Sequence, residues 1–329
     1  MTQSVRFGVL GAAGIAVRQV IPAMQASKQC VVTALASRDA GRAQTVAAQL
    51  GIGASCGSYE ELLARPDVDA VYIPLPNHLH VQWSVRALEA GKHVLCEKPI
   101  GMNVAEAERL LAAASTHPRL KVMEAFMYRF HPQWIRAQAL VREGAIGALR
   151  SVQSFFSYHN VDPKNVRNIA NIGGGALLDI GCYGISLARF LFESEPSGVQ
   201  AQMEYDPKFG TDRLTSAILD FGGGVATFIV GTQMARHQRV NIVGADGRIE
   251  IEIPFNAPSD RPCRIQLQRG TESEEITFET CNQYGLMADA FAEAILRDMP
   301  VPTPLADAVA NMKVIDSIVQ AARTNRSPR

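Results

Sequence analysis

The sequence predicts an α/β protein in which a doubly wound parallel sheet precedes an α+β domain with a large, mostly antiparallel open sheet. Short apolar runs alternate with helical stretches up to residue 125, which is typical of a parallel sheet with right-handed crossovers. Beyond that point, turn-separated alternating segments and a few helices indicate a second domain. The length of 329 residues also favours two domains, because a domain has roughly 100–200 residues. We place the domains at residues 1–125 and 126–329.

In the first domain, each expected strand is a short apolar run and several expected helices have start or stop signals. Strands are expected at Val5–Leu10, Val31–Ala36, Ala70–Pro74, His93–Cys96 and Leu120–Ala125. Helices are expected up to about Ser27, after the capping box of Ser58 and Glu61, and at Asp39–Leu50, His78–Ala90 and Asn103–His117. Gly51 and Gly91 are typical residues for ending two of these helices.

In the second domain, alternating segments predict strands and longer periodic segments predict helices. Strands are expected at Leu149–Tyr158, Val199–Tyr205, Leu214–Phe221, Val225–Val230, Arg239–Val243, Arg248–Ile253, Arg264–Gln268 and Glu275–Phe278. Helices are expected at His131–Glu143, after Gly173-Gly174-Gly175, and at Gly285–Arg297 and Leu305–Arg323. Turns at Gly222-Gly223-Gly224 and Ala245-Asp246-Gly247 predict hairpins.

The composition argues against several classes of protein. Lys and Arg together number 32, as do Asp and Glu, so the formal net charge is zero and no basic field favours nucleic acid or anionic lipid. No apolar run approaches the ~18 residues of a membrane helix, and the N-terminus has no signal-peptide pattern. The six cysteines form no Cys-x-x-Cys pair, which indicates reduced thiols. We expect a cytoplasmic protein that binds neither nucleic acid nor a membrane.

A turn of small residues, Gly11-Ala12-Ala13-Gly14-Ile15-Ala16, follows the first expected strand and begins a helix. It is a degenerate form of the Gly-x-Gly-x-x-Gly/Ala fingerprint, with Ala13 in place of the second glycine. A tight turn, a small residue and the amides of a helix N-terminus suit a dinucleotide pyrophosphate. The strand–turn–helix context favours this interpretation over an ordinary turn of small residues. We therefore expect a Rossmann domain that binds a nicotinamide cofactor.

The end of the second expected strand indicates which cofactor is bound. Ser37 and Arg38 stand where NAD-selective sites carry an acidic residue for the ribose 2′-hydroxyl. A hydroxyl and a guanidinium suit a 2′-phosphate instead. Asp39 is close by, but we interpret it as the cap of the next helix. The sequence predicts NADP, with NAD as the less favoured alternative; a solvated surface charge is the other interpretation of Arg38.

Cys96-Glu97-Lys98-Pro99 follows another expected parallel strand, at the carboxyl edge where ligands bind. A lysine there can donate to a carbonyl or hydroxyl oxygen and take part in acid–base chemistry. Taken alone, a Glu–Lys pair on a surface turn is an equally good interpretation. No set of His, Asp and Glu has metal-ligand spacing, and Gly-x-Ser-x-Gly and Walker motifs are absent. We expect a metal-free reaction and neither a hydrolase nor an NTPase.

Several motifs together resemble the glucose–fructose oxidoreductase/inositol dehydrogenase/MocA family, and the resemblance covers essentially the whole chain. They are Glu97-Lys98-Pro99, the segments 73–80 and 173–183, Met127-Tyr128-Arg129-Phe130-His131-Pro132, Asn165-Val166-Arg167-Asn168 and Asn282-Gln283-Tyr284. The last three are similar to the subgroup that contains glucose–fructose oxidoreductase, NADP-dependent xylose dehydrogenases and dimeric dihydrodiol dehydrogenases.

The resemblance assigns Lys98, Asp179 and Tyr183 to the reacting centre. Many family members have histidine where this chain has Tyr183, and the tyrosine points to the sugar- and diol-oxidising subgroup. The four-residue spacing of Asp179 and Tyr183 agrees, because it places both on one face of a helix. The alternative for Asp179 is a charge favoured by the helix dipole, and for Tyr183 a packed core aromatic.

Further residues are expected to line the cofactor and substrate sites. The cofactor set is Gly11, Ala13, Gly14, Ile15, Ala16, Ser37, Arg38, Pro74, Pro76, Asn77, His80, Glu97, Lys98 and Arg167. The substrate set is Arg129, His131, Asp179, Tyr183 and Tyr284. For Arg129, His131 and Arg167, structural hydrogen bonds are an equally good interpretation.

The resemblance implies a hydride transfer between nicotinamide C4 and a carbinol carbon of an aldose or a cyclic diol. Tyr183 would exchange the hydroxyl proton, Lys98 would hydrogen-bond the reacting oxygen and Asp179 would orient substrate hydroxyls; which of Lys98 and Tyr183 accepts the proton stays open. The alternatives are an aldose–aldose oxidoreductase, a lyase or epimerase that retains its cofactor, and a sensor without turnover. The resemblance also implies a homodimer or higher oligomer formed through the open face of the C-terminal sheet.

Overall fold

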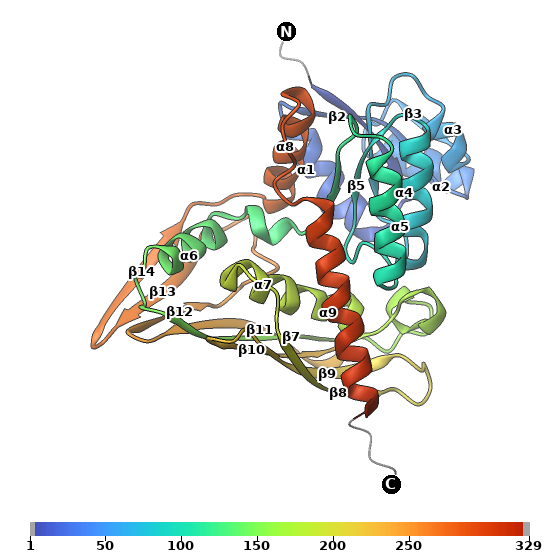
Figure 1. The fold of residues 1–329 in the computed structure, drawn as a ribbon. Coiled ribbons are helices and arrows are strands. Elements are labelled where there is room, and N and C mark those ends of the chain that lie inside the picture. The colour runs from blue at the N-terminus through green and yellow to red at the C-terminus, as the bar shows by residue number, and fades with distance from the viewer. Residues whose placement is uncertain (1–3, 325–329) are drawn as a thin grey trace. The chain divides into compact units, whose positions relative to one another are not determined.

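The computed structural model describes residues 4–324, and these form two compact units (Figure 1). The first unit comprises residues 4–127 and 284–309, and the second comprises residues 128–283 and 310–324. This division differs from the expected boundary after residue 125, because a segment near the C-terminus returns to the first unit. Helix α8 (Gln283–Leu296) places the fully buried Phe291 against Phe7, with ring centroids 6.3 Å apart. A contact between positions so distant in sequence leaves no local signal.

The first unit is built on a six-stranded parallel sheet in the order β3-β2-β1-β4-β5-β6. The strands are β1 (Val5–Leu10), β2 (Cys30–Ala36), β3 (Ala54–Cys56), β4 (Ala70–Ile73), β5 (His93–Cys96) and β6 (Val122–Glu124). This order confirms the predicted doubly wound sheet and is that of the Rossmann fold. The short β3 was not expected, because three residues are too few to show an apolar pattern.

Three helices of the first unit begin at polar caps. The helices and helical turns of this unit are η1 (Ala16–Val20), α1 (Ile21–Gln25), α2 (Ala40–Gln49), α3 (Tyr59–Leu63), η2 (Asn77–Leu79), α4 (His80–Glu89) and α5 (Val104–Ser115), with α8 added from the C-terminal segment. The side chains of Asp39, Ser58 and Asn103 accept from backbone amides at the starts of α2, α3 and α5. The cap at Asp39 confirms its interpretation from sequence.

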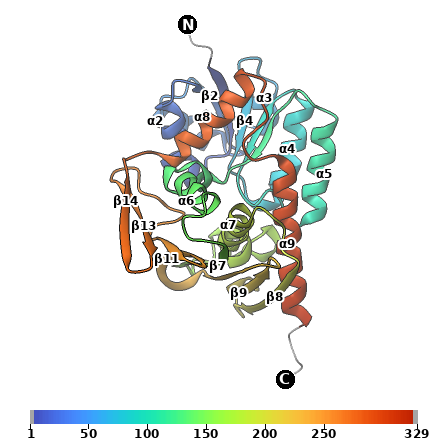
Figure 2. The same ribbon diagram turned by 60° about the vertical axis from the view of Figure 1, so that its left-hand side comes forward.

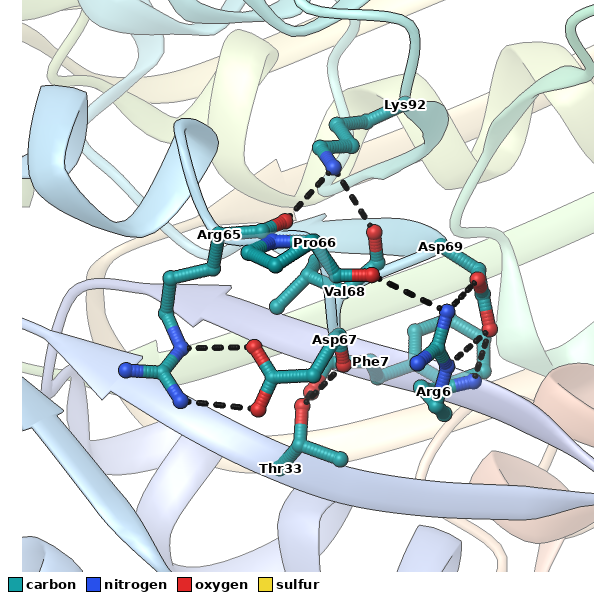
Figure 3. A network of polar contacts seen from close by, with 9 residues as sticks. All are labelled: Arg6, Phe7, Thr33, Arg65, Pro66, Asp67, Val68, Asp69 and Lys92. Carbon is teal, nitrogen blue, oxygen red and sulfur yellow. Dashed lines mark hydrogen bonds and ion pairs between the residues drawn. The ribbon is translucent and has the colours of Figure 1, made fainter.

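A polar network at the amino ends of the strands ties the segment 65–69 to the sheet (Figure 3). Arg6 donates from Nε to Asp69 Oδ2 at 2.9 Å and from its guanidinium to the carbonyl of Pro66 at 3.1 Å. Lys92 donates from Nζ to the carbonyls of Arg65 and Val68, both at 2.8 Å, and burial lowers its pKa. Because this network lies at the amino ends of the strands, it does not occupy the carboxyl ends, where ligands bind in such sheets.

The second unit is built on an eight-stranded sheet in the order β14-β13-β12-β11-β7-β10-β9-β8, in which only the β7–β10 pair is parallel. The strands are β7 (Leu149–His159), β8 (Gly198–Tyr205), β9 (Asp212–Asp220), β10 (Val225–Gly231), β11 (Gln233–Gly244), β12 (Gly247–Ile251), β13 (Cys263–Arg269) and β14 (Glu272–Phe278). The predicted large, mostly antiparallel sheet is confirmed.

Helices α6 (Pro132–Arg142) and α7 (Cys182–Phe192) lie on one face of this sheet, as Figures 1 and 2 show. Along the chain, α6 and α7 are separated by β7 and by the short turns η4 (Val166–Asn168), η5 (Ala170–Ile172) and η6 (Leu177–Gly181). Helix α9 (Leu305–Thr324) begins in the part of the chain assigned to the first unit and ends in the part assigned to the second. The second unit also contains an aromatic cluster. In the cluster, Phe255 lies 5.1 Å from Phe156 and 5.7 Å from Tyr128 between ring centroids. The opposite face of the sheet is open and carries exposed side chains.

By length and composition alone, the segment Ala170–Phe192 is apolar enough to cross a membrane, with a mean hydropathy of 1.4 over its best window. This corrects the expectation that no such run exists. Buried residues make up 78% of that window, as in the core helix of a globular protein. The segment is also irregular, because η5, a glycine turn and η6 precede α7.

His131 is the N-cap of α6, and its ring accepts a hydrogen bond at Nδ1 from the Gln133 amide at 3.2 Å. The residue is 1% exposed, and burial lowers the pKa of His131 to about 4. In the unfolded chain a histidine has a pKa of about 6.5. Between these two values the unfolded chain binds a proton that the folded protein does not bind. The stability from His131 is therefore complete above about pH 6.5 and is lost as the pH falls towards about 4.

We expect His131→Asn to flatten the acid part of the stability curve. Asparagine can still cap α6, but it does not titrate. The Tm of the wild type should fall by several degrees more than that of the variant between neutral pH and about pH 4.5. Exposed His159, at the end of β7, provides the control His159→Asn, which should follow the wild type. Parallel curves for all three proteins would contradict the assignment.

Candidate active site

The fingerprint turn at the end of β1 requires glycine at its first position. Gly11 has φ +114°, and its amide donates to the carbonyl of Ala36 at 2.8 Å. A Cβ at Gly11 would lie 2.9 Å from Leu75 Cδ2, so a larger residue would also displace the neighbouring loop. The turn leads into η1, a π-helical turn whose N-cap, Ile15, makes no side-chain capping bond. Backbone amides at such a helix start suit an anion.

Two arginines that the sequence analysis did not identify, Arg18 and Arg42, contact this turn, and Arg38, which it did identify, lies at the end of the neighbouring strand. Arg42, on the first turn of α2, donates to the carbonyl of Ala12 at 2.7 Å. A Cβ at Gly14 would lie 2.7–3.0 Å from the guanidinium of Arg18. Arg38 is exposed and lies beside Tyr59; burial raises the pKa of Tyr59, and the Arg38 charge opposes that rise. Arg18 and Arg42 belong to no motif, and only helical periodicity from the turn could have suggested them.

Ser37 and Asp39 are fixed at the end of β2. Ser37 is 8% exposed, and its hydroxyl accepts from the Asp39 amide at 3.2 Å. The Asp39 carboxylate accepts from the Arg42 amide at 3.0 Å. Because Asp39 is engaged as a helix cap, the groups at this strand end that suit a phosphate are the Ser37 hydroxyl and the neighbouring guanidinium groups.

The segment after β4 contains the predicted cofactor residues Pro74, Pro76, Asn77 and His80, of which His80 begins α4 and differs from the rest in its burial. Pro76 and Asn77 are half-buried, whereas His80 is 1% exposed. The ring of His80 lies between two backbone carbonyls, with Nδ1 2.7 Å from Pro99 O and Nε2 2.7 Å from Leu75 O. The ring nitrogens of His80 thus face backbone carbonyls in the interior, and its predicted cofactor contact stays a prediction.

The turn that carries Lys98 is held on both sides by buried groups. Lys98 is half-buried, directly after Glu97, whose Oε1 accepts from the Tyr72 hydroxyl at 2.7 Å. Two residues beyond Lys98, the Ile100 amide donates to Glu124 Oε1 at 2.7 Å, and Glu124 is 3% exposed. These bonds fix the backbone around Lys98 at the carboxyl edge of β5, where the sequence predicted it.

Tyr284, predicted as a substrate residue, belongs to the first unit and lies near Glu97. Burial, followed by the charge of Glu97, raises its pKa. Tyr72 and Tyr284 are thus both neighbours of the same carboxylate. The substrate role of Tyr284 stays a prediction.

In the second unit, Asp179 is the centre of a three-residue polar group. Its Oδ2 accepts from the Tyr158 hydroxyl at 2.6 Å and from Arg167 Nε at 2.8 Å. The charge of Asp179 raises the pKa of Arg167, and burial followed by that charge raises the pKa of Tyr158. Arg167, predicted to bind cofactor, is therefore paired with Asp179 in this unit. Tyr158 was not identified from sequence, because it ends an ordinary alternating strand.

A buried aspartate positions the turn that carries Asp179. Asp212 is 6% exposed, and its Oδ2 accepts from the Leu177 amide and from the Thr215 hydroxyl, both at 2.7 Å. Burial raises the pKa of Asp212 to about 6. Gly175 has φ +119°, and a Cβ there would overlap the Asp212 carboxylate. The glycine run is thus required for Asp212 to reach the start of η6, which sequence spacing did not reveal.

Tyr183 lies in the first turn of α7, just after the π-helical turn, and is 5% exposed. Its ring centroid lies 5.2 Å from that of Phe255, 5.8 Å from that of Tyr128 and 5.9 Å from that of Phe156. This packing fits the alternative of a core aromatic as well as a proton-transfer role for the hydroxyl. The role of Tyr183 in catalysis stays a prediction.

Arg129 and His131, predicted to line the substrate site, make structural contacts. Arg129 donates from Nη2 to Ser186 Oγ at 2.8 Å, and its guanidinium lies over the Phe190 ring, 5.5 Å from the centroid. His131 is buried as the cap of α6, which fits the structural alternative, and its predicted contact with substrate stays a prediction. Over residues 4–324, no three His, Cys, Asp or Glu side chains are grouped so as to hold a metal ion.

Comparison with known proteins identifies the family. The model described as "Oxidoreductase family, NAD-binding Rossmann fold" matches residues 5–126, and that of the GFO/IDH/MocA C-terminal domain matches residues 134–250. A D-xylose 1-dehydrogenase (NADP(+)) from Haloferax volcanii is 38% identical over 322 residues, which are 97% of this chain and 97% of the relative.

Two solved structures are similar over nearly the full length. A 3-ketoreductase from Actinomadura kijaniata, in complex with NADP and TDP-benzene, is 33% identical, with a TM-score of 0.91 and coverage of 97% of this chain and 98% of that chain. An aldose–aldose oxidoreductase from Caulobacter crescentus, complexed with glycerol, is 30% identical, with a TM-score of 0.91 and coverage of 98% and 99%. This chain therefore belongs to the GFO/IDH/MocA family of oxidoreductases, as its sequence motifs predicted.

Proposed function

We propose that the protein is an NADP-dependent oxidoreductase that transfers a hydride between nicotinamide C4 and a carbinol carbon of an aldose or a cyclic diol. The observation that carries this proposal is the fingerprint turn, with Gly11 at φ +114° and arginines beside it. The relatives support the same chemistry, because one is named an NADP(+)-dependent xylose dehydrogenase and one is a ketoreductase solved with NADP.

The residues at the carboxyl edge of the first sheet fit NADP. The amides at the start of η1 would hold the pyrophosphate, and Ser37 with Arg38 would hold the 2′-phosphate. Arg42 lies on the first turn of α2 and adds a second positive charge near this strand end. An acidic partner for the 2′-hydroxyl of NAD is not available in Asp39, which caps α2. When bound, the cofactor supplies or accepts the hydride.

The protein's own residues would manage the proton that accompanies the hydride. Lys98, on a turn fixed by Glu124 and Tyr72, would donate a hydrogen bond to the reacting oxygen. Tyr183 would take the hydroxyl proton during oxidation and return it during reduction. Asp179, already paired with Arg167 and Tyr158, would orient substrate hydroxyls. Rigid support of this kind keeps a proton donor in one geometry.

A second candidate is an aldose–aldose oxidoreductase that keeps its cofactor between two half-reactions. The observation that supports this second candidate is the structural similarity to the Caulobacter enzyme, with a TM-score of 0.91. Mass spectrometry of the purified protein and absorbance at 340 nm with added NADP+ and an aldose panel distinguish the two. A steady rise in absorbance supports the dehydrogenase; retained NADP(H) and product formation without a rise support the alternative.

The assembly that we propose is a homodimer formed through the open face of the second unit's sheet. This face has a hollow of about 690 Å³ lined by side chains from five strands, β7 to β11, including Phe155. Ile218 and Ile229 are 44% and 40% exposed on neighbouring strands of the same face. A second copy suits this surface, because the net charge of the chain is zero and apolar groups at its centre would be buried.

Removing the Arg38 charge should weaken NADP+ binding more than NAD+ binding. A charge-assisted contact is worth ~1.5–3 kcal/mol, so Arg38→Ala should raise the Kd for NADP+ by roughly 10–150-fold and leave that for NAD+ nearly unchanged. Isothermal titration of both cofactors measures this directly. Arg119→Ala, at an exposed position after α5, removes the same charge elsewhere and should change neither Kd. Equal weakening of both cofactors would show that Arg38 does not select between them.

Lys98→Met and Tyr183→Phe should each lower kcat by roughly 10²–10⁴-fold if both side chains manage one proton. The double variant should be little worse than the poorer single variant, because groups that act as a unit are non-additive. Lys28→Met and Tyr205→Phe, both at exposed positions, are matched controls, and thermal melts confirm folding. Near-full kcat in Tyr183→Phe across the pH range would leave Tyr183 with a packing role only.

The proposed dimer predicts a light-scattering mass of twice that of one chain at low micromolar concentration. Ile229→Asp would place a charge in the apolar centre of the open face and should shift the protein to the monomer. Ile135→Asp, at a position of α6 where Ile135 is 56% exposed, should leave the mass unchanged. A monomeric wild type, or an Ile229→Asp variant that remains dimeric, would contradict the proposed interface.

A further inference from the structure

His80 joins two loops at the carboxyl edge of the first sheet. It begins α4 and is 1% exposed. Its Nδ1 lies 2.7 Å from the carbonyl oxygen of Pro99, which directly follows Lys98. Its Nε2 lies 2.7 Å from the carbonyl oxygen of Leu75, in the loop after β4. The same ring thus contacts the turn that carries Lys98 and the loop predicted to contact the cofactor.

A neutral imidazole cannot satisfy both carbonyls at once. A carbonyl oxygen only accepts, and neutral histidine has a single N–H. One contact is then a hydrogen bond, while in the other a ring lone pair faces an oxygen. A doubly protonated ring would satisfy both, but burial lowers the pKa of His80 to about 4, against the opposing effect of the two carbonyl contacts; Lys98 and His78 lower it slightly further. Near neutral pH the ring therefore donates a hydrogen bond to only one of the two carbonyls, that of Pro99 or that of Leu75.

The two tautomers therefore hold different parts of the site. With the hydrogen on Nδ1, the ring donates to Pro99 and holds the turn beside Lys98. With the hydrogen on Nε2, it donates to Leu75, whose side chain packs against the fingerprint turn. A Cβ at Gly11 would lie 2.9 Å from Leu75 Cδ2, which shows how closely these segments pack.

We propose that His80 is a positioning residue that couples the cofactor loop to the lysine turn through its choice of tautomer. The coupling rests on the proposed function, because it needs a cofactor against the 74–77 loop. Once the cofactor holds that loop, Leu75 no longer depends on His80, and the ring hydrogen moves to Nδ1. One proton leaves Nε2 and one arrives at Nδ1, so the charge of the ring does not change. The His80 ring then adds its hydrogen bond to the turn of Lys98 only when the cofactor is in place.

The tautomer is observable by NMR in the intact protein with ring-¹⁵N-histidine. A ring nitrogen without hydrogen resonates far from one that carries it, and the His80→Gln spectrum assigns the His80 signals among the seven histidines. We expect the hydrogen of His80 predominantly on Nε2 in cofactor-free protein and on Nδ1 after saturation with NADP+. Ring signals that do not change on saturation, or two protonated nitrogens in both samples, would overturn the proposal.

Two substitutions separate the contacts, because each retains one donor. The amide of asparagine in His80→Asn falls near the place of Nδ1, and that of glutamine in His80→Gln near the place of Nε2. His80→Gln should lower kcat by about tenfold with the Kd for NADP+ little changed, whereas His80→Asn should raise that Kd by about tenfold with kcat little changed. A merely structural histidine would give two variants that lose kcat, affinity and Tm together.

His93→Asn is a matched control for general loss of stability. His93 lies at the amino end of β5, away from Lys98, and its Nδ1 accepts from the Lys121 amide at 2.9 Å. This variant should lower the Tm without changing kcat or the Kd. If a His80 variant does not fold, the NMR comparison of the wild type decides. A wild type that binds no NADP+ contradicts the proposed function, whereas one that binds NADP+ with no tautomer change contradicts only the coupling.

Discussion

Hydrogen bonds from buried side chains to backbone amides fix the two turns on which the candidate site depends. Glu124 accepts from the Ile100 amide at 2.7 Å and holds the turn after Lys98. Asp212 accepts from the Leu177 amide at 2.7 Å and holds the turn before Asp179. A carboxylate is buried at tolerable cost only where donors replace its water. Each carboxylate therefore fixes its turn, and the amide of that turn makes the burial of the carboxylate tolerable. An apolar residue in place of Glu124 or Asp212 would leave the turn without this bond, and the neighbouring Lys98 or Asp179 would be less firmly positioned.

The parts of the fold that were predictable from sequence are those with local signals. The strand–turn–helix at Gly11, the cap at Asp39 and the turn at Lys98 each lie within a few consecutive residues, and the structure places them as expected along one sheet edge. The return of α8 onto the first sheet had no such signal, since Phe291 meets Phe7 across nearly the whole chain. Tyr158 and Asp212 were missed for the same reason: their partners at Asp179 and Leu177 are 21 and 35 residues away.

Two histidines show that a motif does not fix the direction in which a side chain points. His80 and His131 both stand in segments that resemble binding motifs, yet each is 1% exposed and faces backbone groups. The residue type indicates what chemistry a side chain can perform, but its direction decides whether the ring contacts a ligand or the core. That direction depends on tertiary packing, which cannot be read from the sequence. By contrast, Arg42 has no motif and still reaches the carbonyl of Ala12, because the first turn of α2 points it towards the fingerprint turn. Motif membership and proximity to the site are separate properties.

The ring of His80 lies between two backbone carbonyls, and this arrangement has an energetic cost that bears on function. A buried acceptor left without a donor costs roughly 1–3 kcal/mol, so a neutral ring at this position leaves the folded protein less stable than a fully paired group would. Unfavourable arrangements of this kind persist where the surrounding structure holds them in place, and they are frequent at active sites and at segments that change conformation. Two other buried groups of the first unit have partners of the matching kind: Lys92 donates to two carbonyls and Glu124 Oε1 accepts from an amide. The mismatch lies between the loop after β4 and the turn of Lys98, the place where a bound cofactor could relieve it by holding one of the two loops.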